Sequence, residues 1–397
     1  MGRAAVDNPF TPGFGNLPRV FTGRRSELAD LELMVERLGA GIYEQPRLVT
    51  GDRGVGKTAL LRELEDEQRA AGRWVARASA TRGDALIGRV CARLADVLDE
   101  DLAARLSRSA LAALRRLGGV EVGPRGVRVE LTNPPAAGED RADALGGLLA
   151  ETGALARERG TVLVLLVDEA QNCNRAALGD LFHALQEATT RTVTERDPVS
   201  GATLRHALPV GVVVAGLPGL VAQLSRSGST FGERSKPVPL DVLGEADMRE
   251  GLQAFARAGG AVFDADALEA VMAASGGYPY FLHVIGSHVW NAGDGDVITL
   301  AEARAGITAA RAYLDAFYEE RLRPLGDRQR AYLDAAAHLD PAERTSGRIA
   351  AELDTTSDRL ASTWQSLIER HALLRPAGGR GRLAFTLPGL ADYLRRS

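Results

Sequence analysis

The side chains best suited to chemistry in this chain lie in one glycine-rich run, Gly51-Asp52-Arg53-Gly54-Val55-Gly56-Lys57-Thr58. The run matches the phosphate-binding pattern G-x-x-x-x-G-K-[ST] at every fixed position. Lys57 is one of only two lysines, with Lys236, although lysines and arginines together number 48. A compact ammonium fits inside a tight ring of backbone amides around a β-phosphate, whereas the wide guanidinium of arginine does not. The spacing therefore predicts that loop 51–58, continued by Ala59, binds a nucleoside triphosphate.

The residues on either side of the loop agree with this prediction. Residues 47–50 form a short apolar run that predicts a buried parallel strand, and apolar residues at helical spacing predict a helix over 58–64. The helix N-terminus would add partial positive charge beneath the phosphates. We expect Lys57 to reach the β- and γ-phosphates and Thr58 to give its hydroxyl to Mg²⁺. The alternative is a plain glycine turn before a helix.

A second acidic signal follows about a hundred residues later. Residues 161–167 are a nearly continuous apolar run, which is typical of a central strand covered on both faces. The run ends in Asp168-Glu169, and residues 162–169 resemble a Walker B motif. At the carboxyl end of such a strand we expect Asp168 to hold the Mg²⁺ shell and Glu169 to polarise the attacking water. Acidic residues after a strand are common, so the assignment depends on the phosphate-binding loop.

Composition limits the classes of protein that fit. A chain of 397 residues has room for two or three domains, and its net charge of −4 gives no global basic field for nucleic acid. The two cysteines, Cys91 and Cys173, lack metal-ligand spacing, so a zinc site or a disulfide framework is not expected. No apolar stretch reaches membrane-spanning length, and residues 1–15 contain no apolar signal core. We expect a cytoplasmic protein without a membrane segment.

The chain alternates strands and helices up to about residue 240 and is helical afterwards. Further strands are expected at 74–78, 210–215 and 237–240, and alternating βα units predict an α/β fold with a parallel, doubly wound sheet. Segments 120–131 and 191–205 read as two β-hairpins. Each hairpin is either a decorative loop or a finger that contacts DNA or a neighbouring subunit.

Three further motifs resemble the AAA+ ATPases, and in particular the branch that holds origin-recognition ATPases and their bacterial relatives. Residues 21–28 resemble the box that precedes the phosphate-binding loop in that branch, residues 215–218 resemble the end of its fourth strand, and residues 276–282 resemble its helical lid. The resemblance implies that the box crosses the adenine of ATP, with Gly23 allowing close approach and Arg24 bracing the pocket. It also implies an α/β core with a parallel sheet flanked by helices.

The resemblance assigns roles in the lid and at the subunit boundary. Tyr278 and Pro279 are expected against the base or the ribose. AAA+ sites are completed across interfaces by an arginine, and Arg234 precedes the fifth strand where relatives place that residue. The alternative for Arg234 is a surface arginine in an arginine-rich chain. If Arg234 acts in trans, the working form is a homo-oligomer.

Two departures from the AAA+ pattern predict slow hydrolysis without a partner. The end of the fourth strand reads Ala215-Gly216-Leu217 where relatives carry a polar sensor residue. The lid offers Tyr278-Pro279 where many relatives carry a sensor arginine. Gln171 could take over part of the work of positioning water, or it could be a solvated glutamine at the start of a helix.

The last seventy residues read as a winged helix. Helices are expected over 328–339 and 348–353, and a third is expected to be capped by Thr355 or Thr356 and to run to His371. A strand, a basic glycine-rich tip and a second strand over 373–385 suit a wing. Its arginines suit DNA phosphate, namely Arg375, Arg380 and Arg382. The third helix has no strong basic face, so docking of a protein partner stays open.

The sequence thus predicts a nucleotide-binding core over 1–240, an all-α lid over 241–325 and a winged-helix domain over 326–397. We expect an ATP- and Mg²⁺-dependent ATPase that releases ADP and acts as an oligomeric switch, with double-stranded DNA as a possible partner. The alternative is a signalling scaffold that binds ATP without turnover.

Overall fold

The computed structural model describes residues 3–13, 15, 18–81, 86–118, 120–123, 126–129, 139–197, 199–226, 230–379 and 381–397. By internal contacts the chain forms two compact units. Arg25–Gly51 and Leu60–Leu240 make the first, here called the sheet unit. The second, here called the C-terminal unit, contains Met1–Arg24, Asp52–Ala59 and Asp241–Ser397. The phosphate-binding loop therefore groups with the C-terminal unit, although the strand before it belongs to the sheet unit.

A five-stranded parallel sheet is the centre of the sheet unit, with strand order β2-β5-β8-β1-β9. Its strands lie at the positions that the apolar runs predict: β1 Arg47–Gly51, β2 Trp74–Ser79, β5 Leu163–Asp168, β8 Val210–Gly216 and β9 Lys236–Leu240. Every residue of β5 and β8 is buried, as expected of strands covered on both faces.

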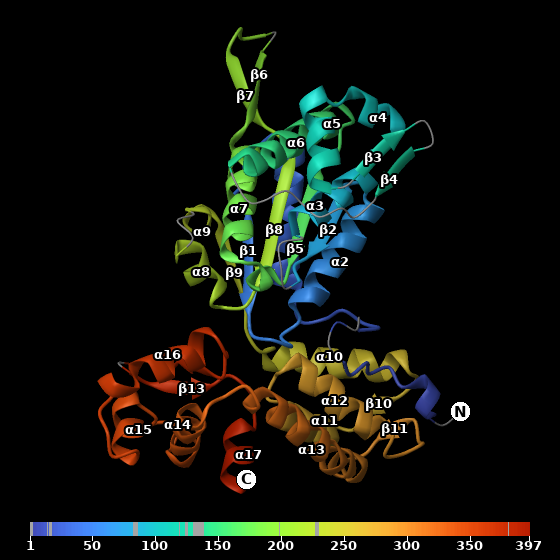
Figure 1. Ribbon diagram of the computed structural model, residues 1–397. Helices are drawn as coiled ribbons and strands as arrows, with labels where there is room; N and C mark the ends of the chain where they lie inside the picture. Colours follow the sequence, from blue (N-terminus) through green and yellow to red (C-terminus); the bar gives the residue numbers. More distant parts are fainter. Residues whose placement is uncertain are drawn as a thin grey trace. The chain divides into compact units, whose positions relative to one another are not determined.

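Helices flank this sheet, so the predicted α/β class with a parallel, helix-covered sheet is confirmed (Figure 1). Helices α1, α6 and α7 contact β8, and α3 contacts β2. The helices and turns of this part of the chain are α1 Arg25–Gly39, α2 Lys57–Ala70, α3 Leu86–Asp96, α4 Glu100–Arg105, α5 Arg108–Gly118, α6 Glu139–Glu158, η2 Ala170–Asn172, α7 Arg175–Thr190, α8 Leu220–Arg226 and α9 Phe231–Arg234.

Both predicted hairpins form. Strand β3 (Val120–Gly123) pairs antiparallel with β4 (Gly126–Val129), and β6 (Thr192–Arg196) pairs antiparallel with β7 (Thr203–Ala207). Residues 124, 125, 130 and 131 of the first expected hairpin lie outside the described residues. Figure 1 shows the β6–β7 hairpin reaching away from the sheet, and a role as a finger stays a prediction.

The C-terminal unit contains the helices expected for a lid, together with a pair of short strands that an all-α lid does not have. Strand β10 (Val262–Phe263) pairs in parallel with β11 (Val297–Ile298). Two-residue strands leave no periodicity to detect in a sequence, so they were not predicted. The other elements of this region are η1 Ala5–Asp7, α10 Glu245–Ala258, α11 Ala265–Ser275, α12 Pro279–Trp290 and α13 Leu300–Leu322.

The first residues of the chain form an N-terminal strap, Arg3–Thr11, that packs against α10 and α12. The Phe10 ring lies 5.3 Å from the Phe255 ring, and Nε1 of Trp290 donates to the carbonyl of Ala4 at 3.0 Å. A Cβ atom at Gly286 would come within 2.4 Å of the Phe10 ring, so the lack of a side chain at this helical position lets the ring of the strap pack against α12. Pro9 and Phe10 of the strap are buried, whereas residues 4–7 are exposed.

Three helices, a hairpin and a final helix complete the chain. Their bounds are α14 Asp327–His338, α15 Ser346–Glu352, η3 Asp358–Leu360, α16 Ala361–Glu369, β12 Leu374–Pro376, β13 Leu383–Phe385 and α17 Leu390–Arg396. The Tyr318 hydroxyl of α13 donates to the Pro388 carbonyl, which ties this part to the lid. The assignment as a winged helix stays a prediction.

The expected start of the third helix was wrong. Thr355 and Thr356 do not cap it, and α16 begins at Ala361 after the turn η3. The Thr355 amide instead donates to the carbonyl of Ala350 at 3.0 Å, and Asp354 has a φ of 49°. These residues close the preceding helix with a left-handed turn, so they cannot open the next one.

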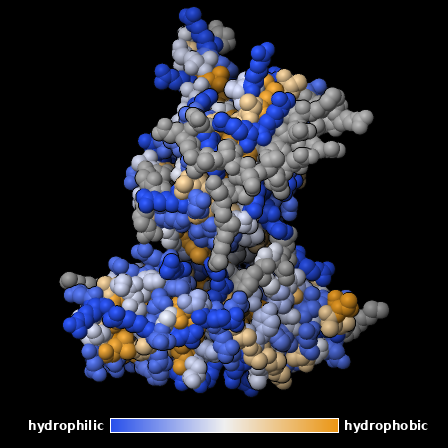
Figure 2. Space-filling view, viewed as in Figure 1, coloured by the Kyte–Doolittle hydropathy of each residue, from blue (hydrophilic) through white to orange (hydrophobic). Residues whose placement is uncertain are grey.

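The described surface offers no sign of a membrane segment. No described helix is both long and apolar enough to cross a bilayer. On the face drawn in Figure 2, the coloured hydrophobic residues form small separate patches within a hydrophilic surface. Single exposed apolar residues of this kind need no partner to explain them.

Candidate active site

The phosphate-binding loop has the backbone that its glycines predict. Strand β1 ends at Gly51, the loop follows, and α2 begins at Lys57. Gly54 and Gly56 have φ values of 87° and 98°, in the region that side chains rarely adopt. This curl is the one that turns successive N–H groups inward to cradle an anion.

Lys57 is 5% exposed, which is uncommon for a lysine, and Nζ donates to the carbonyl of Asp52 at 2.8 Å. The ammonium is therefore held over the loop in which it is expected to bind phosphate. Thr58, the next residue of α2, is half-buried.

Two side chains of the C-terminal unit, those of Tyr278 and Arg24, form hydrogen bonds to the backbone of the loop. The Tyr278 hydroxyl donates to the Arg53 carbonyl, and a Cβ atom at Gly54 would lie 3.1 Å from the Tyr278 ring. Arg24, 7% exposed, donates to the carbonyl of Val55 at 3.1 Å and to that of Asp241. The bracing that the resemblance implied for Arg24 is thus applied to the loop itself.

The other predicted nucleotide contacts lie close to these two side chains. Gly23 has a φ of 76°, and a Cβ atom there would come within 2.8 Å of Leu243. Pro279 is the first residue of α12, and Tyr278 is fully buried. Because the Tyr278 hydroxyl already bonds the loop, its contact with a base or ribose stays a prediction.

The acidic pair lies at the end of β5. Asp168 is 2% exposed, and its Oδ1 accepts the backbone N–H of Glu169 at 2.9 Å. Glu169 has a φ of 56°, a left-handed conformation that is rare for glutamate. Strain of this kind is concentrated at functional sites.

Gln171 connects this pair to the neighbouring strand. Its Nε2 donates to Oε2 of Glu169 at 2.5 Å, and its Oε1 accepts the N–H of Leu217 at 3.1 Å. Gln171 is half-buried in the turn η2 and both ends of its amide are bonded within the protein, while its role in positioning water stays a prediction.

The strand order brings the two motifs to the same edge of the sheet. Strands β1 and β5 both run parallel to β8, which lies between them. Their carboxyl ends, at Gly51 and Asp168, therefore lie at the same edge of the sheet. In open α/β sheets, ligands bind at this edge.

Charge around the loop is mixed. Burial raises the pKa of the Asp52 carboxyl, whereas the positive charges of Lys57 and Arg375 lower it. Asp52 occupies the second position of the loop, so in its ionised form it would oppose the charge of a bound phosphate.

Arg234 is exposed at the end of the short helix α9. Phe231 anchors that helix, with its ring 4.5 Å from the Phe182 ring. An exposed arginine on an anchored turn can reach a neighbouring subunit, and this role stays a prediction.

Mg²⁺ fits the donors that the chain offers. The described residues contain no group of three or more His, Cys, Asp or Glu that could hold a metal. Mg²⁺ is commonly held by one or two carboxylates together with substrate phosphates. Asp168, a buried carboxylate at the end of β5, suits that mode. Thr58 as a second ligand stays a prediction.

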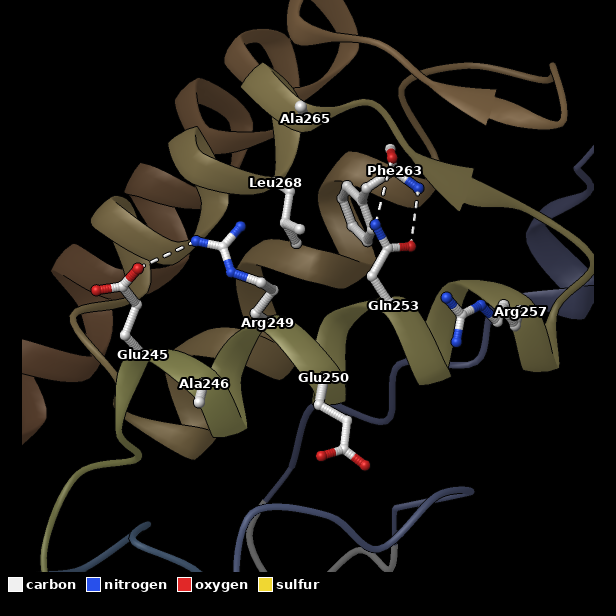
Figure 3. Close-up of a pocket in the computed structure, with 9 residues that line it drawn as sticks. All are labelled: Glu245, Ala246, Arg249, Glu250, Gln253, Arg257, Phe263, Ala265 and Leu268. Carbon is white, nitrogen blue, oxygen red and sulfur yellow. Dashed lines mark hydrogen bonds and ion pairs between the residues drawn. The ribbon is translucent and has the colours of Figure 1, made fainter.

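A separate groove of about 830 Å³ lies between α10 and the start of α11. Figure 3 shows Gln253 paired through its amide with the backbone of Phe263, while Arg249 bonds Glu245 at 3.1 Å. None of the residues predicted to contact nucleotide lines this groove.

The arginines expected to bind DNA are partly engaged. Nη1 of Arg375 lies 2.9 Å from each carboxylate oxygen of Asp241, and Arg382 donates to the carbonyl of Ala342 at 3.0 Å. Arg380 lies outside the described residues.

Comparison with known proteins gives two family matches, each over part of the chain. A family model described as an AAA ATPase domain matches residues 20–199, a span that holds the loop and the acidic pair. Residues 20–199 are thus similar to the AAA+ P-loop ATPases. A second model, a domain of unknown function (DUF8462), matches residues 315–394. No curated protein matches the chain in sequence.

Solved structures share the fold of this chain. The Walker-type ATPase PABY2304 of Pyrococcus abyssi matches with a TM-score of 0.60 and 17% identity, over 94% of this chain and 96% of that one. The ORC2 protein of Aeropyrum pernix, in ADPNP and ADP complexes, matches with a TM-score of 0.53 and 13% identity, over 96% and 95% of the two chains. The predicted resemblance to the origin-recognition-like ATPases is confirmed for the fold.

Proposed function

We propose that this protein binds ATP with Mg²⁺ and hydrolyses it to ADP and phosphate, acting as an oligomeric switch on DNA. The observation that carries the proposal is the shared edge of the sheet. There β1 leads into the phosphate-binding loop, and β5 ends in Asp168 and Glu169. The second carboxylate favours hydrolysis over simple binding, because it supplies a base for water.

Each residue of the site has a distinct task in this proposal. The loop amides and Lys57 hold the β- and γ-phosphates. Thr58 and Asp168 would hold Mg²⁺, which would shield the phosphate charge. Glu169 orients a water and accepts its proton as oxygen attacks the γ-phosphorus and the bond to ADP breaks. Arg234 of a neighbouring subunit stabilises the charge that develops.

The base and ribose would lie against Gly23, Arg24, Tyr278 and Pro279. Arg24 and Tyr278 both form hydrogen bonds to the backbone of the loop. A nucleotide that displaces either side chain would therefore also change the support of the loop. The same contacts support a switch, because a change in the lid is transmitted directly to the phosphate site.

Action on DNA is the part of the proposal that rests on the C-terminal hairpin. A basic tip with Arg380 and Arg382 suits phosphate contacts, and the last 71 residues hold eleven arginines against nine acidic residues. We expect Arg380→Ala/Arg382→Ala to weaken duplex binding about equally across sequences and to lower the salt slope by about one unit per lost contact.

The matched control is Arg304→Ala/Arg311→Ala, which removes two exposed arginines from α13. It changes net charge equally and leaves the hairpin intact, so its duplex affinity should stay near that of the parent. If the parent with ATP binds no duplex at low salt, the C-terminal region docks a protein instead.

A second candidate is a scaffold that binds ATP, assembles and does not turn over. The pairing of Arg375 with Asp241 favours it, because that arginine is already engaged within the protein. The absence of a polar side chain across Ala215-Gly216-Leu217 also favours it.

Steady-state ATPase activity across protein concentration, with and without duplex DNA, separates the two candidates. Turnover that rises faster than protein concentration supports an oligomeric hydrolase. Glu169→Gln should keep ATP affinity and trap bound ATP, since charge is lost while size is kept. A parent that binds ATP and shows no turnover under any of these conditions would contradict hydrolysis and leave the scaffold.

A further inference from the structure

We propose that Gln171 is a positioning residue that sets the carboxylate of Glu169 for attack and ties it to the end of β8. The inference rests on the proposed role of Glu169 as the base. It assigns to Gln171 the place of the polar side chain that the end of β8 does not carry.

The chemistry of the amide fixes its orientation. Nε2 can only donate, which suits Oε2 of Glu169 at 2.5 Å, and Oε1 can only accept, which suits the N–H of Leu217 at 3.1 Å. A flipped amide would place oxygen against carboxylate and N–H against N–H. Only one orientation of the Gln171 amide therefore makes both hydrogen bonds.

The end of β8 leaves room for this contact. A Cβ atom at Gly216 would lie 2.9 Å from Oε1 of Gln171 and 2.6 Å from Leu220. A side chain at position 216 would thus occupy the space that the glutamine uses. The lack of a polar side chain at the end of β8 and the position of Gln171 are therefore linked, because both could not occupy the same space.

The turn that carries Gln171 is also held on its other side. Nδ2 of Asn172 donates to the carbonyl of Ala80 at 3.3 Å, and the N–H of Ala80 donates to the carbonyl of Asp168 at 2.8 Å. The turn η2 therefore bridges the ends of β2 and β8, which flank β5 in the sheet. A shift of β8 would move Gln171 and, through it, the carboxylate of Glu169.

One carboxylate oxygen remains for water in this arrangement. Oε2 of Glu169 accepts from Gln171, so Oε1 is the atom expected to take the proton of the attacking water. A carboxylate fixed through one oxygen reaches the attack geometry with less loss of rotational freedom.

The test compares Gln171→Leu with the parent in ATP affinity, KM and kcat. The change keeps size and removes both hydrogen bonds, so we expect kcat to fall at least about tenfold while KM and affinity stay within about twofold. Gln171→Glu, which sets a like charge beside Glu169, should lower kcat at least as much. The matched control is Gln223→Leu, which loses a bond of 3.4 Å to the Cys173 carbonyl at the end of η2 and leaves both bonds of the Gln171 amide in place.

A double-mutant cycle separates positioning from a structural defect. Single-turnover rates should show no further loss when Gln171→Leu is added to Glu169→Gln, because the carboxylate that Gln171 positions is already gone. An additive loss, or a change in KM with kcat kept, would overturn the inference.

Two further outcomes distinguish this inference from the proposed function. If Glu169→Gln stops turnover and Gln171→Leu hydrolyses at the parent rate or faster, Glu169 is the base and Gln171 does not position it. If Glu169→Gln hydrolyses at the parent rate, the proposed base itself is wrong.

Discussion

The ammonium of Lys57 is buried inside the loop that it is expected to serve. We predict that Lys57→Ala weakens ATP binding by at least about a hundredfold, because the charge-assisted bonds to phosphate are lost. Calorimetry with ATP in Mg²⁺ measures this. The natural control is Lys236→Ala, since Lys236 is the only other lysine and pairs with Asp30 in the sheet unit. Equal affinity in parent and Lys57→Ala would remove the loop as the phosphate site.

Asp52 adds an opposing charge in the same loop. Burial raises its pKa, yet in the ionised state it still repels a bound triphosphate. We predict that Asp52→Asn tightens ATP binding by about two- to fivefold above neutral pH. The gain should shrink as the pH falls, because Asp52 of the parent then takes up a proton. Weaker ATP binding by Asp52→Asn would mean that the Asp52 carboxylate supports the loop conformation that binds ATP and does not oppose the nucleotide.

His283 predicts a pH dependence of stability. Burial between Phe10 and Phe255 lowers its pKa to about 4 from the ordinary value of 6.5, and Nδ1 accepts the N–H of Thr11 at 3.2 Å. The unfolded chain therefore takes up the proton first. The free energy of unfolding should fall by on the order of 3 kcal/mol as the pH drops from 6.5 to 4.

Urea unfolding across that pH range measures the effect. His283→Leu should reduce the slope, whereas the same change at the exposed His338 should leave it unchanged. A parent whose unfolding free energy is flat between pH 6.5 and 4 would contradict the burial of a neutral imidazole.

The sequence is sufficient to propose those residues of the candidate site whose spacing is local. Lys57 and Thr58 follow from an eight-residue pattern, and Asp168 and Glu169 follow from the end of an apolar run. The contact between Tyr278 and Arg53 joins residues 225 positions apart, and no local pattern encodes it. Gln171 was recognised as a candidate, yet its partner Leu217 could be found only from the order of the strands.

Among elements, buried parallel strands were the most predictable. Runs such as 161–167 contain so little polar character that no other element fits them. The start of α16 was not predictable in the same way, because Thr355 serves either as a cap or as part of a closing turn. Which of these two roles Thr355 takes depends on how α15 ends. The residue pattern of α16 alone holds no information about that end.

The junction between lid and loop is an element-scale device that can be tested. Tyr278→Phe removes the hydroxyl that bonds the Arg53 carbonyl and keeps the packed ring, which lies 4.8 Å from the Phe281 ring. We predict about a three- to tenfold loss of ATP affinity, corresponding to the net value of one hydrogen bond. Fluorescent-nucleotide titration measures this.

Tyr332→Phe is the matched control for that prediction. The Tyr332 hydroxyl is buried without a hydrogen-bond partner in the structure, so its removal should leave ATP affinity unchanged. Parent-like affinity in Tyr278→Phe would show that the hydroxyl does not brace the loop.

At the scale of the assembly, a trans arginine predicts complementation. Arg234→Ala and Glu169→Gln should each hydrolyse ATP poorly, because each lacks one part of a shared site. A mixture of the two should recover part of the activity, since an intact Glu169 then meets an intact Arg234 from its neighbour. Mixing each variant with itself is the control, and a mixture no faster than its parts would contradict an arginine acting in trans.

The order of strands in the sheet also bears on how the protein is made. Strand β1 pairs only with β8 and β9, which come from residues 210–240, among the described strands. During synthesis Leu48 and Val49, both buried in the finished sheet, stay without strand partners until those residues have left the ribosome. A nascent chain released before Val210 would therefore lack the support for its phosphate-binding loop. It would also expose an apolar strand edge, which is the kind of surface that aggregates or is bound by chaperones.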